Sequence, residues 1–371
     1  STATADNRNR WALRIDVIPY PYCMPRDTLM LDGGPLTIEG VVDVAREGTI
    51  VHLADALGGV LASTRSVVET AAAGDEAVYG INTGFGALSR KRIDSDSNRH
   101  LQLNLIRSHA AGVGDPLPDE TVRAMMLILA ASLARGVSGV RLELVQQIVD
   151  LLNHGVTPVV PELGSVGASG DLAPLSHAAL VLVGEGEAVI DGVAMSGSDA
   201  LASAGLAPIA LEAKEGLALI NGTHLMAAQA ALSLFDIERL VDGAIAAAAM
   251  AVDACLGTDA TLDDRIHVVR CQPGQIEVAR RMRALLEGST IVTSHVDDDP
   301  RVQDPYSLRA TPQVVGAAVD AIRSAREVVE RELGAVTDNP LVFDGEIRSG
   351  GNFHGMPLAI AMDSIAVALC A

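Results

Sequence analysis

The feature that most constrains the fold is a long apolar stretch, Met226 to Leu256, which is rich in alanine and poor in bulky side chains. Hydrophobic residues make up 49% of the chain but aromatic residues only 2%, so small and branched aliphatic side chains must fill the core. Alanine and leucine are strong helix formers, which favours a mainly α-helical protein. Five charged residues interrupt the stretch, too many for a membrane span, so we predict a buried helix. They are Asp236, Glu238, Arg239, Asp242 and Asp253.

At 371 residues, the chain is long enough for two or three domains. Residues 1–28 carry three prolines and no periodic pattern, and we predict an N-terminal extension there. Residues 29–205 are expected to form an N-terminal domain, and residues 206–371 a bundle of long helices. The last apolar segment, Met356 to Ala371, has neither a capping glycine nor a terminal Lys or Arg. This suggests that the bundle is truncated or that a partner covers that end.

Apolar spacing predicts several helices ahead of the bundle. They cover Thr37–Arg46, Val51–Ala73, Leu101–Ala111 and Thr121–Arg135. Ser138 is a candidate cap for a further helix that ends near His154. Pro158–Leu175 is predicted to be a loop, and residues 188–195 a strand pair that turns on Asp191-Gly192.

The formal net charge is −20, and an acidic surface repels phosphate backbones and anionic lipids. We therefore expect no nucleic-acid partner and no membrane role. The four cysteines are scattered without a CxxC pair, which fits a reducing compartment. With no apolar run typical of a signal peptide at the N-terminus, this favours a cytoplasmic protein. The acidic run Asp297 to Asp299 is interpreted as a solvated loop, and we expect no metal site.

Seven mostly small residues, Gly164 to Gly170, lie between Leu163 and Asp171. By themselves they indicate an ordinary turn, because a backbone with so little side chain can bend tightly. The same property permits a reaction. If the amide nitrogen of Gly170 reaches the carbonyl carbon of Ala168, a five-membered ring closes. Loss of water from that ring and from the Ser169 side chain then leaves an exocyclic methylene.

This segment resembles the signature of the histidine and phenylalanine ammonia-lyase family, and the resemblance covers about residues 29–371. Five further blocks stand in the family's order: Tyr79–Gly86, Lys214–Thr223, Gln303–Arg309, Asp338–Leu341 and Ser349–Gly355. The resemblance implies a long-helix bundle of the ammonia-lyase and aspartase-like type, with the N-terminal domain carrying the cofactor loop. It also implies 4-methylidene-imidazole-5-one, formed autocatalytically from Ala168-Ser169-Gly170. No metal or dissociable cofactor is expected, and the implied assembly is a homotetramer.

The resemblance also implies roles for single residues in the elimination of ammonia from an aromatic amino acid. Tyr79 resembles the catalytic tyrosine that handles the β-proton; the plainer interpretation is a packed tyrosine. Arg309 resembles the residue that binds the substrate carboxylate, which a guanidinium suits well, although a surface ion pair is the plainer reading of an arginine. Five other residues resemble parts of the family's active site. They match groups around the methylidene ring and the substrate amine (Tyr306, Asn221), polar support for the pocket (Gln303, Asn339) and an aromatic wall against the cofactor (Phe353). The three amides could instead cap loops.

The substrate prediction depends on Ser95-Asp96, which stand where phenylalanine-preferring members tend to carry Phe-Leu. A carboxylate can accept a hydrogen bond from an imidazole N–H and gains nothing from a phenyl ring. Asp96 is therefore the candidate substrate reader, although residues 94–99 could equally be a solvated helix entry. We predict elimination of ammonia from L-histidine to give urocanate. The rival activities are those of a phenylalanine or tyrosine ammonia-lyase and a 2,3-aminomutase.

Two departures from the family pattern bear on this prediction. The family's C-terminal third, with a glutamate-bearing motif that touches the substrate ring, is absent. This keeps open a function of another class, an inactive truncated scaffold or assembly subunit. In addition, His224 stands where histidine-type members usually have glutamine.

Overall fold

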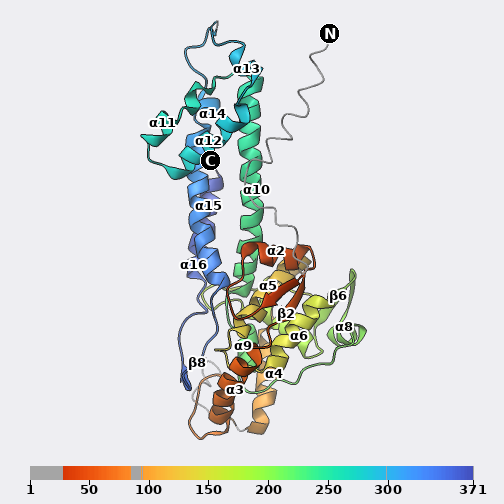
Figure 1. The fold of residues 1–371 in the computed structure, drawn as a ribbon. Coiled ribbons are helices and arrows are strands. Elements are labelled where there is room, and N and C mark those ends of the chain that lie inside the picture. The colour runs from red at the N-terminus through yellow and green to blue at the C-terminus, as the bar shows by residue number, and fades with distance from the viewer. Residues whose placement is uncertain (1–27, 85–92, 94, 298, 371) are drawn as a thin grey trace. The chain divides into compact units, whose positions relative to one another are not determined.

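The computed structural model describes residues 28–84, 93, 95–297 and 299–370, and these are mainly helical, as predicted (Figure 1). Their contacts divide them into two compact units. The loop unit comprises the described residues up to Ser233 together with Val328–Ile360. The helical unit comprises Leu234–Glu327 and the described residues from Ala361 onward. The predicted N-terminal extension lies outside the described residues except for Thr28, and the predicted domain boundaries stay predictions.

The loop unit packs helices around small sheets. Its helices are α2 (Ile38–Arg46), α3 (Leu57–Ala73), α4 (Ser95–His109), α5 (Asp119–Ala134), α6 (Leu142–Asn153), α7 (Leu172–Leu182), α8 (Gly197–Ser203) and α9 (Glu215–Ile220). Two strand pairs precede α7: β1 (Thr28–Leu31) with β2 (Ile50–Leu53), and β3 (Val113–Pro116) with β5 (Pro161–Leu163). The other sheets are β4 (Thr157–Pro158), β6 (Glu187–Ile190) and β7 (Val193–Ser196) in one, and β8 (Leu341–Phe343) with β9 (Glu346–Arg348) in the other.

Helix α5 forms the core of the loop unit, because every residue from Ala124 to Ala134 is buried. A helix that is apolar on all sides is stable only when protein surrounds it, and α2 and α6 both pack against α5. The start of α2 is fixed locally, since the Thr37 hydroxyl accepts a hydrogen bond from the Gly40 N–H at 3.0 Å.

Two local expectations for this unit are wrong. Val51–Ala73 is not one helix, because Ile50–Leu53 forms β2 in parallel with β1, and α3 begins only at Leu57. Ser138 caps no helix: α6 begins at Leu142, and the buried Ser138 hydroxyl has no hydrogen-bond partner among the described residues.

The predicted hairpin is confirmed. Strands β6 and β7 turn on Asp191 (φ 49°) and Gly192 (φ 77°), the two left-handed positions that a tight two-residue turn requires. The predicted loop 158–175 is shorter than expected, because β5 lies within it and α7 already begins at Leu172.

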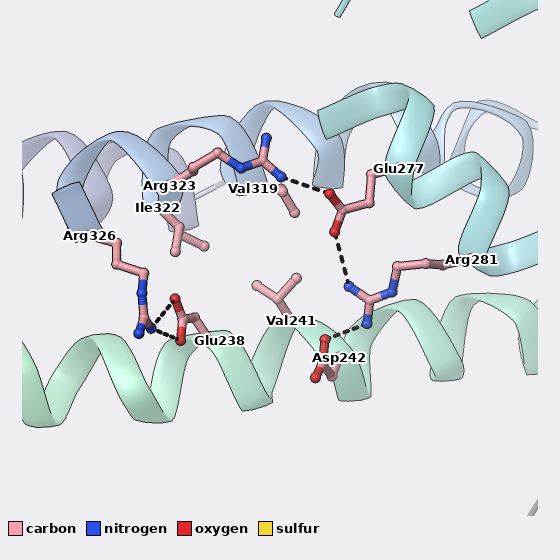
Figure 2. A pocket seen from close by; sticks show the side chains of 9 residues that line it. All are labelled: Glu238, Val241, Asp242, Glu277, Arg281, Val319, Ile322, Arg323 and Arg326. Atoms are coloured by element: carbon pink, nitrogen blue, oxygen red, sulfur yellow. Dashed lines mark hydrogen bonds and ion pairs between the residues drawn. The ribbon is translucent and has the colours of Figure 1, made fainter. Parts of the chain in front are cut away.

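The predicted apolar helix is α10 (His224–Ala254), which begins in the loop unit and continues into the helical unit. The stretch Glu215–Ala254 is long and apolar enough to cross a membrane by composition, but 83% of its apolar window is buried, as in a core helix. Within the helical unit, α12 (Pro273–Leu286) and α15 (Thr311–Leu333) run beside α10 (Figure 2). The remaining elements are η2 (Asp259–Leu262), α11 (Asp264–Val268), α13 (Thr290–Thr293), α14 (Tyr306–Arg309) and α16 (Met356–Leu369).

Candidate active site

Ala168 and Ser169 form the exposed tip of a tight turn. Gly167 and Gly170 pair across the turn as an antiparallel bridge, and the Gly170 N–H donates to the Gly167 carbonyl at 3.2 Å. The turn therefore brings the Gly170 nitrogen back toward the chain that precedes Ser169, which is the approach that ring closure needs.

Position 170 accepts only glycine. Its φ is 78°, and a Cβ there would lie 2.5 Å from the Gly222 carbonyl oxygen and 3.2 Å from that of Phe353. A non-glycine residue would be strained in this left-handed conformation and would also clash with two backbone oxygens. The far side of the turn is thus pressed against backbone from two distant segments.

Asp171 fastens the turn to the start of α10. Its fully buried carboxylate accepts from the Ser165 hydroxyl at 2.6 Å and from the N–H groups of Leu225 and Met226 at 2.8 and 3.0 Å. The Asp171 N–H donates to the Gly222 carbonyl at 2.7 Å. Burial raises the pKa of the Asp171 carboxyl, and these hydrogen bonds oppose that rise. Through Asp171, both ends of the loop Gly164–Gly170 are tied to the N-terminus of α10, a place where a carboxylate is favoured.

Asn221 lies at the end of α9 and is tied to the Asp338 segment. Its side-chain amide donates to Asp338 Oδ1 at 3.3 Å and to the Asn339 carbonyl at 3.1 Å. The other Asp338 oxygen, Oδ2, lies 2.5 Å from Lys214 Nζ, and both side chains are buried. The side chain of Asn339 accepts from the Gly350 N–H at 2.6 Å, so it also holds a loop.

The segment 349–355 runs alongside the turn. The Gly355 N–H donates to the Gly167 carbonyl at 2.9 Å, and Phe353, half-buried, places its carbonyl oxygen against Gly170. Two sequence blocks that lie far apart along the chain, those of Asn221 and Phe353, therefore meet at the Ala168-Ser169 turn. The block of Asn339 is hydrogen-bonded to both of them.

Tyr79 sits on a turn beside α9, with 36% of the residue exposed. A Cβ on the next residue, Gly80 (φ 74°), would lie 2.5 Å from Leu217 Cδ2 and 3.4 Å from Pro340 Cδ. The Tyr79 turn therefore rests on the helix that ends in Asn221 and on the neighbour of Asn339.

Asp96 lies in the first turn of α4, but its side chain is outside what the structure describes, as are residues 85–92 and 94. Its role as substrate reader stays a prediction.

Gln303, Tyr306 and Arg309 lie in the helical unit, and their roles in the site stay predictions. Gln303 and Tyr306 are exposed. The Arg309 guanidinium lies over the Tyr306 ring, 4.6 Å from its centroid, and the buried Arg309 Nε has no hydrogen-bond partner in the described chain. Both side chains line a cavity of about 420 Å³ with Thr261, Ile266, Ala310 and Gln313. An arginine that lines a cavity is suited to bind an anion there.

Sequence reasoning assigned no role to Asp171, Lys214 or Asp338, although all three stand in or beside the recognised blocks. One signal was available, since Lys214 is one of only two lysines in a chain that otherwise uses arginine. Its burial and its partner 124 residues away have no local signature.

His224 is also buried, and neither ring nitrogen has a hydrogen-bond partner among the described residues. Burial lowers the pKa of His224 to about 4, and the nearby Asp338 carboxylate opposes that shift. The ring is therefore neutral at physiological pH.

A second cavity, of about 130 Å³, lies between α10, α12 and α15 (Figure 2). Its charged side chains are paired with one another: Glu238 with Arg326, Asp242 with Arg281, and Glu277 with Arg323. Mutually satisfied charges indicate a network that joins three helices rather than a reactive site, and no predicted site residue lines this cavity. No group of three or more His, Cys, Asp or Glu that could hold a metal occurs within the described ranges.

The chain is similar in sequence to known enzymes. Residues 36–371 match the family model of the aromatic amino acid lyases. Histidine ammonia-lyase of Myxococcus xanthus is 50% identical over 348 residues, which is 93% of this chain and 68% of that protein. The corresponding enzyme of Gloeobacter violaceus is 50% identical over 345 residues, covering 92% and 67%.

Two solved structures show the same fold. A tyrosine aminomutase from Streptomyces globisporus has a TM-score of 0.86 and 37% identity, over 92% of this chain and 68% of that one. Histidine ammonia-lyase from Trypanosoma cruzi has a TM-score of 0.83 and 39% identity, over 92% and 64%. The chain therefore belongs to the aromatic amino acid lyase family, and it is a carbon–nitrogen lyase.

Proposed function

We propose that this protein eliminates ammonia from L-histidine to give urocanate. The observation that carries the proposal is the Ala168-Ser169 turn, which is clamped between the start of α10 and the segment 349–355. The relatives from M. xanthus and G. violaceus, at 50% identity, favour histidine over other aromatic amino acids.

The family is known for a methylidene-imidazolone prosthetic group, and the residues of this turn fit its formation. The Gly170 nitrogen would attack the Ala168 carbonyl carbon, and that oxygen would leave as water with the amide hydrogens of Gly170 and Ser169. The Ser169 hydroxyl and its α-proton would leave as a second water. Gly170 has no Cβ to obstruct the approach, and Asp171 anchors the chain directly after Gly170. When formed, the group supplies an electron sink for the substrate.

The other site residues bind and orient the substrate in this proposal. Arg309, which lines a cavity, pairs with the substrate carboxylate through its guanidinium. Tyr79 takes the β-proton, and Asp96 accepts a hydrogen bond from the imidazole N–H. Asn221 is already oriented by Asp338, so its remaining amide oxygen can face the substrate amine.

The activity is tested by incubating the protein separately with histidine, phenylalanine and tyrosine and following product absorbance. We expect urocanate from histidine. Cinnamate or coumarate without urocanate would overturn the histidine assignment, and a β-amino acid product would indicate an aminomutase like the S. globisporus relative.

An inactive scaffold is the alternative from another class, and intact mass separates the two. Cyclisation and dehydration remove two waters, about 36 Da. Ser169→Ala should abolish both the mass loss and the activity, whereas the exposed Ser203→Ala, on α8, should keep both. Full sequence mass in the wild-type protein would favour the scaffold.

We further propose a homotetramer in the cytoplasm, with an amino acid substrate as its small-molecule partner. Cys255, Cys271 and Cys370 are free thiols on the surface, which fits a reducing compartment. Light scattering on the purified protein tests the assembly, and a monomeric mass would contradict it.

A further inference from the structure

Two buried amides on α4 form a hydrogen-bonded relay. Asn98 is 3% exposed and Gln102 is completely buried, and they stand one helical turn apart on the same face. The Asn98 amide donates to the Ile81 carbonyl at 2.6 Å, and the Gln102 amide donates to Asn98 Oδ1 at 3.3 Å. Gln102 Oε1 in turn accepts the Leu217 N–H at 3.2 Å.

The ends of this relay belong to two parts of the candidate site. Ile81 lies on the Tyr79 turn, and its N–H donates to the Val78 carbonyl at 3.1 Å within that turn. Leu217 lies in the first turn of α9, the helix that ends at Asn221. The relay therefore runs from the loop that carries the proposed base to the helix that presents the proposed amide.

Gln102 also replaces a missing helix cap. The first N–H groups of a helix have no partner within it, and the N-cap residue of α9, Lys214, makes no side-chain cap hydrogen bond. Gln102 supplies that acceptor from a different helix. The approach is close, because a Cβ on Gly216 would lie 2.6 Å from the Gln102 carbonyl oxygen.

An apolar pair would fill the same space without the need to satisfy buried polar groups, which are expensive to leave unpaired. The amides instead fix the register of three segments. We propose that Asn98 and Gln102 are positioning residues that set the Tyr79 turn against α9 and anchor the first turn of α4, where Asp96 stands. This inference rests on the proposed function for its catalytic consequence.

Gln102→Met tests the relay, because methionine keeps the length of the side chain and loses both hydrogen bonds. Misplacement of a catalytic group by about 1 Å can lower a rate 100-fold. We expect kcat for histidine to fall tenfold or more while KM changes little and the mass loss of about 36 Da persists. Gln102→Glu, which keeps an acceptor for the Leu217 N–H, should recover part of kcat.

Asn153→Leu is the matched control. Its amide makes two hydrogen bonds of 2.9 Å, both to Val51, and so ties α6 to β2, neither of which carries a site residue. It should lose stability as Gln102→Met does but leave kcat unchanged. A drop in kcat equal to that of Gln102→Met would reduce the relay to a general stability effect and overturn the proposal.

Hydrogen exchange gives a readout that does not need activity. In Gln102→Met, amides of residues 78–83 and 215–221 should both exchange faster, and in Asn153→Leu neither segment should. Faster exchange in α9 alone would overturn the coupling. If the wild-type protein makes no urocanate, the proposed function fails, and the exchange result alone decides the relay.

Discussion

Lys214 and Asp338 form a buried ion pair whose loss should be large enough to measure. The Lys214 side chain is fully buried, that of Asp338 is 2% exposed, and 2.5 Å separates Nζ from Oδ2. Lys214→Met keeps the aliphatic stem but leaves the carboxylate uncompensated. Removing one partner of a buried pair costs about 3–5 kcal/mol. A typical domain is stable by only about 5–15 kcal/mol, so the free energy of unfolding should fall by a large fraction.

Urea denaturation followed by circular dichroism measures this loss. The double variant Lys214→Met/Asp338→Asn removes both charges and keeps an acceptor for the Asn339 N–H, now 2.6 Å from Asp338 Oδ1. It should recover most of the stability. The control Arg348→Met breaks a pair with Glu346 whose side chains are 67% and 63% exposed, and it should cost about 1 kcal/mol or less. The reasoning is refuted if Lys214→Met costs no more than this control, or if the double variant is as unstable as the single one.

Three further outcomes follow from single residues. Gly170→Ala should abolish the mass loss of about 36 Da, because its Cβ would lie 2.5 Å from the Gly222 oxygen; intact mass checks this, and a normal mass loss would contradict it. The folded pKa of His224, about 4, lies below its ordinary 6.5, so the stability that the neutral ring provides is present above pH 6.5 and is lost as pH falls toward 4. His224→Gln should flatten the dependence of unfolding midpoints on pH in that window, and an unchanged slope would contradict the assignment. Arg309→Lys should raise KM for histidine roughly tenfold or more with a smaller effect on kcat, because an ammonium cannot form the bidentate contact; steady-state kinetics would show an unchanged KM if Arg309 does not bind the carboxylate.

The helices were predictable where apolar spacing is local. Residues 119–134 and 224–254 are rich in apolar helix formers, so a helix could be predicted for each. The hairpin at Asp191-Gly192 follows from the residues that its tight turn requires. Strand β2 was missed because Ile50–Leu53 is defined by its pairing with β1, a non-local partner that no window of sequence contains.

The site residues also differ in whether local sequence could identify them. The Ala168-Ser169-Gly170 turn could be found because its chemistry demands three particular residues in a row. Lys214 and Asp338 could not be paired from sequence, since 124 residues separate them and the rarity of lysine in this chain does not indicate which carboxylate is the partner. The close approach of Gly222 to Gly170 is likewise a property of the packed backbone and not of either segment.

The close approach of Gly222 to Gly170 leads to different predictions for two glycines outside the Ala168-Ser169-Gly170 triplet. A Cβ on Gly222, whose φ is 152°, would lie 2.6 Å from Thr337 Oγ1 and against the His224 ring, and both of these side chains are buried. A Cβ on Gly355 would lie 2.5 Å from Met226 Sδ, the far end of a flexible side chain, and 3.1 Å from the Gly167 carbonyl oxygen, a contact that a shift of a few tenths of an ångström relieves. Gly222→Ala should therefore prevent the mass loss as Gly170→Ala does, whereas Gly355→Ala should retain it, because Met226 can change rotamer. Intact mass distinguishes the two, and equal behaviour would mean that the Gly222 backbone does not set the geometry of the turn.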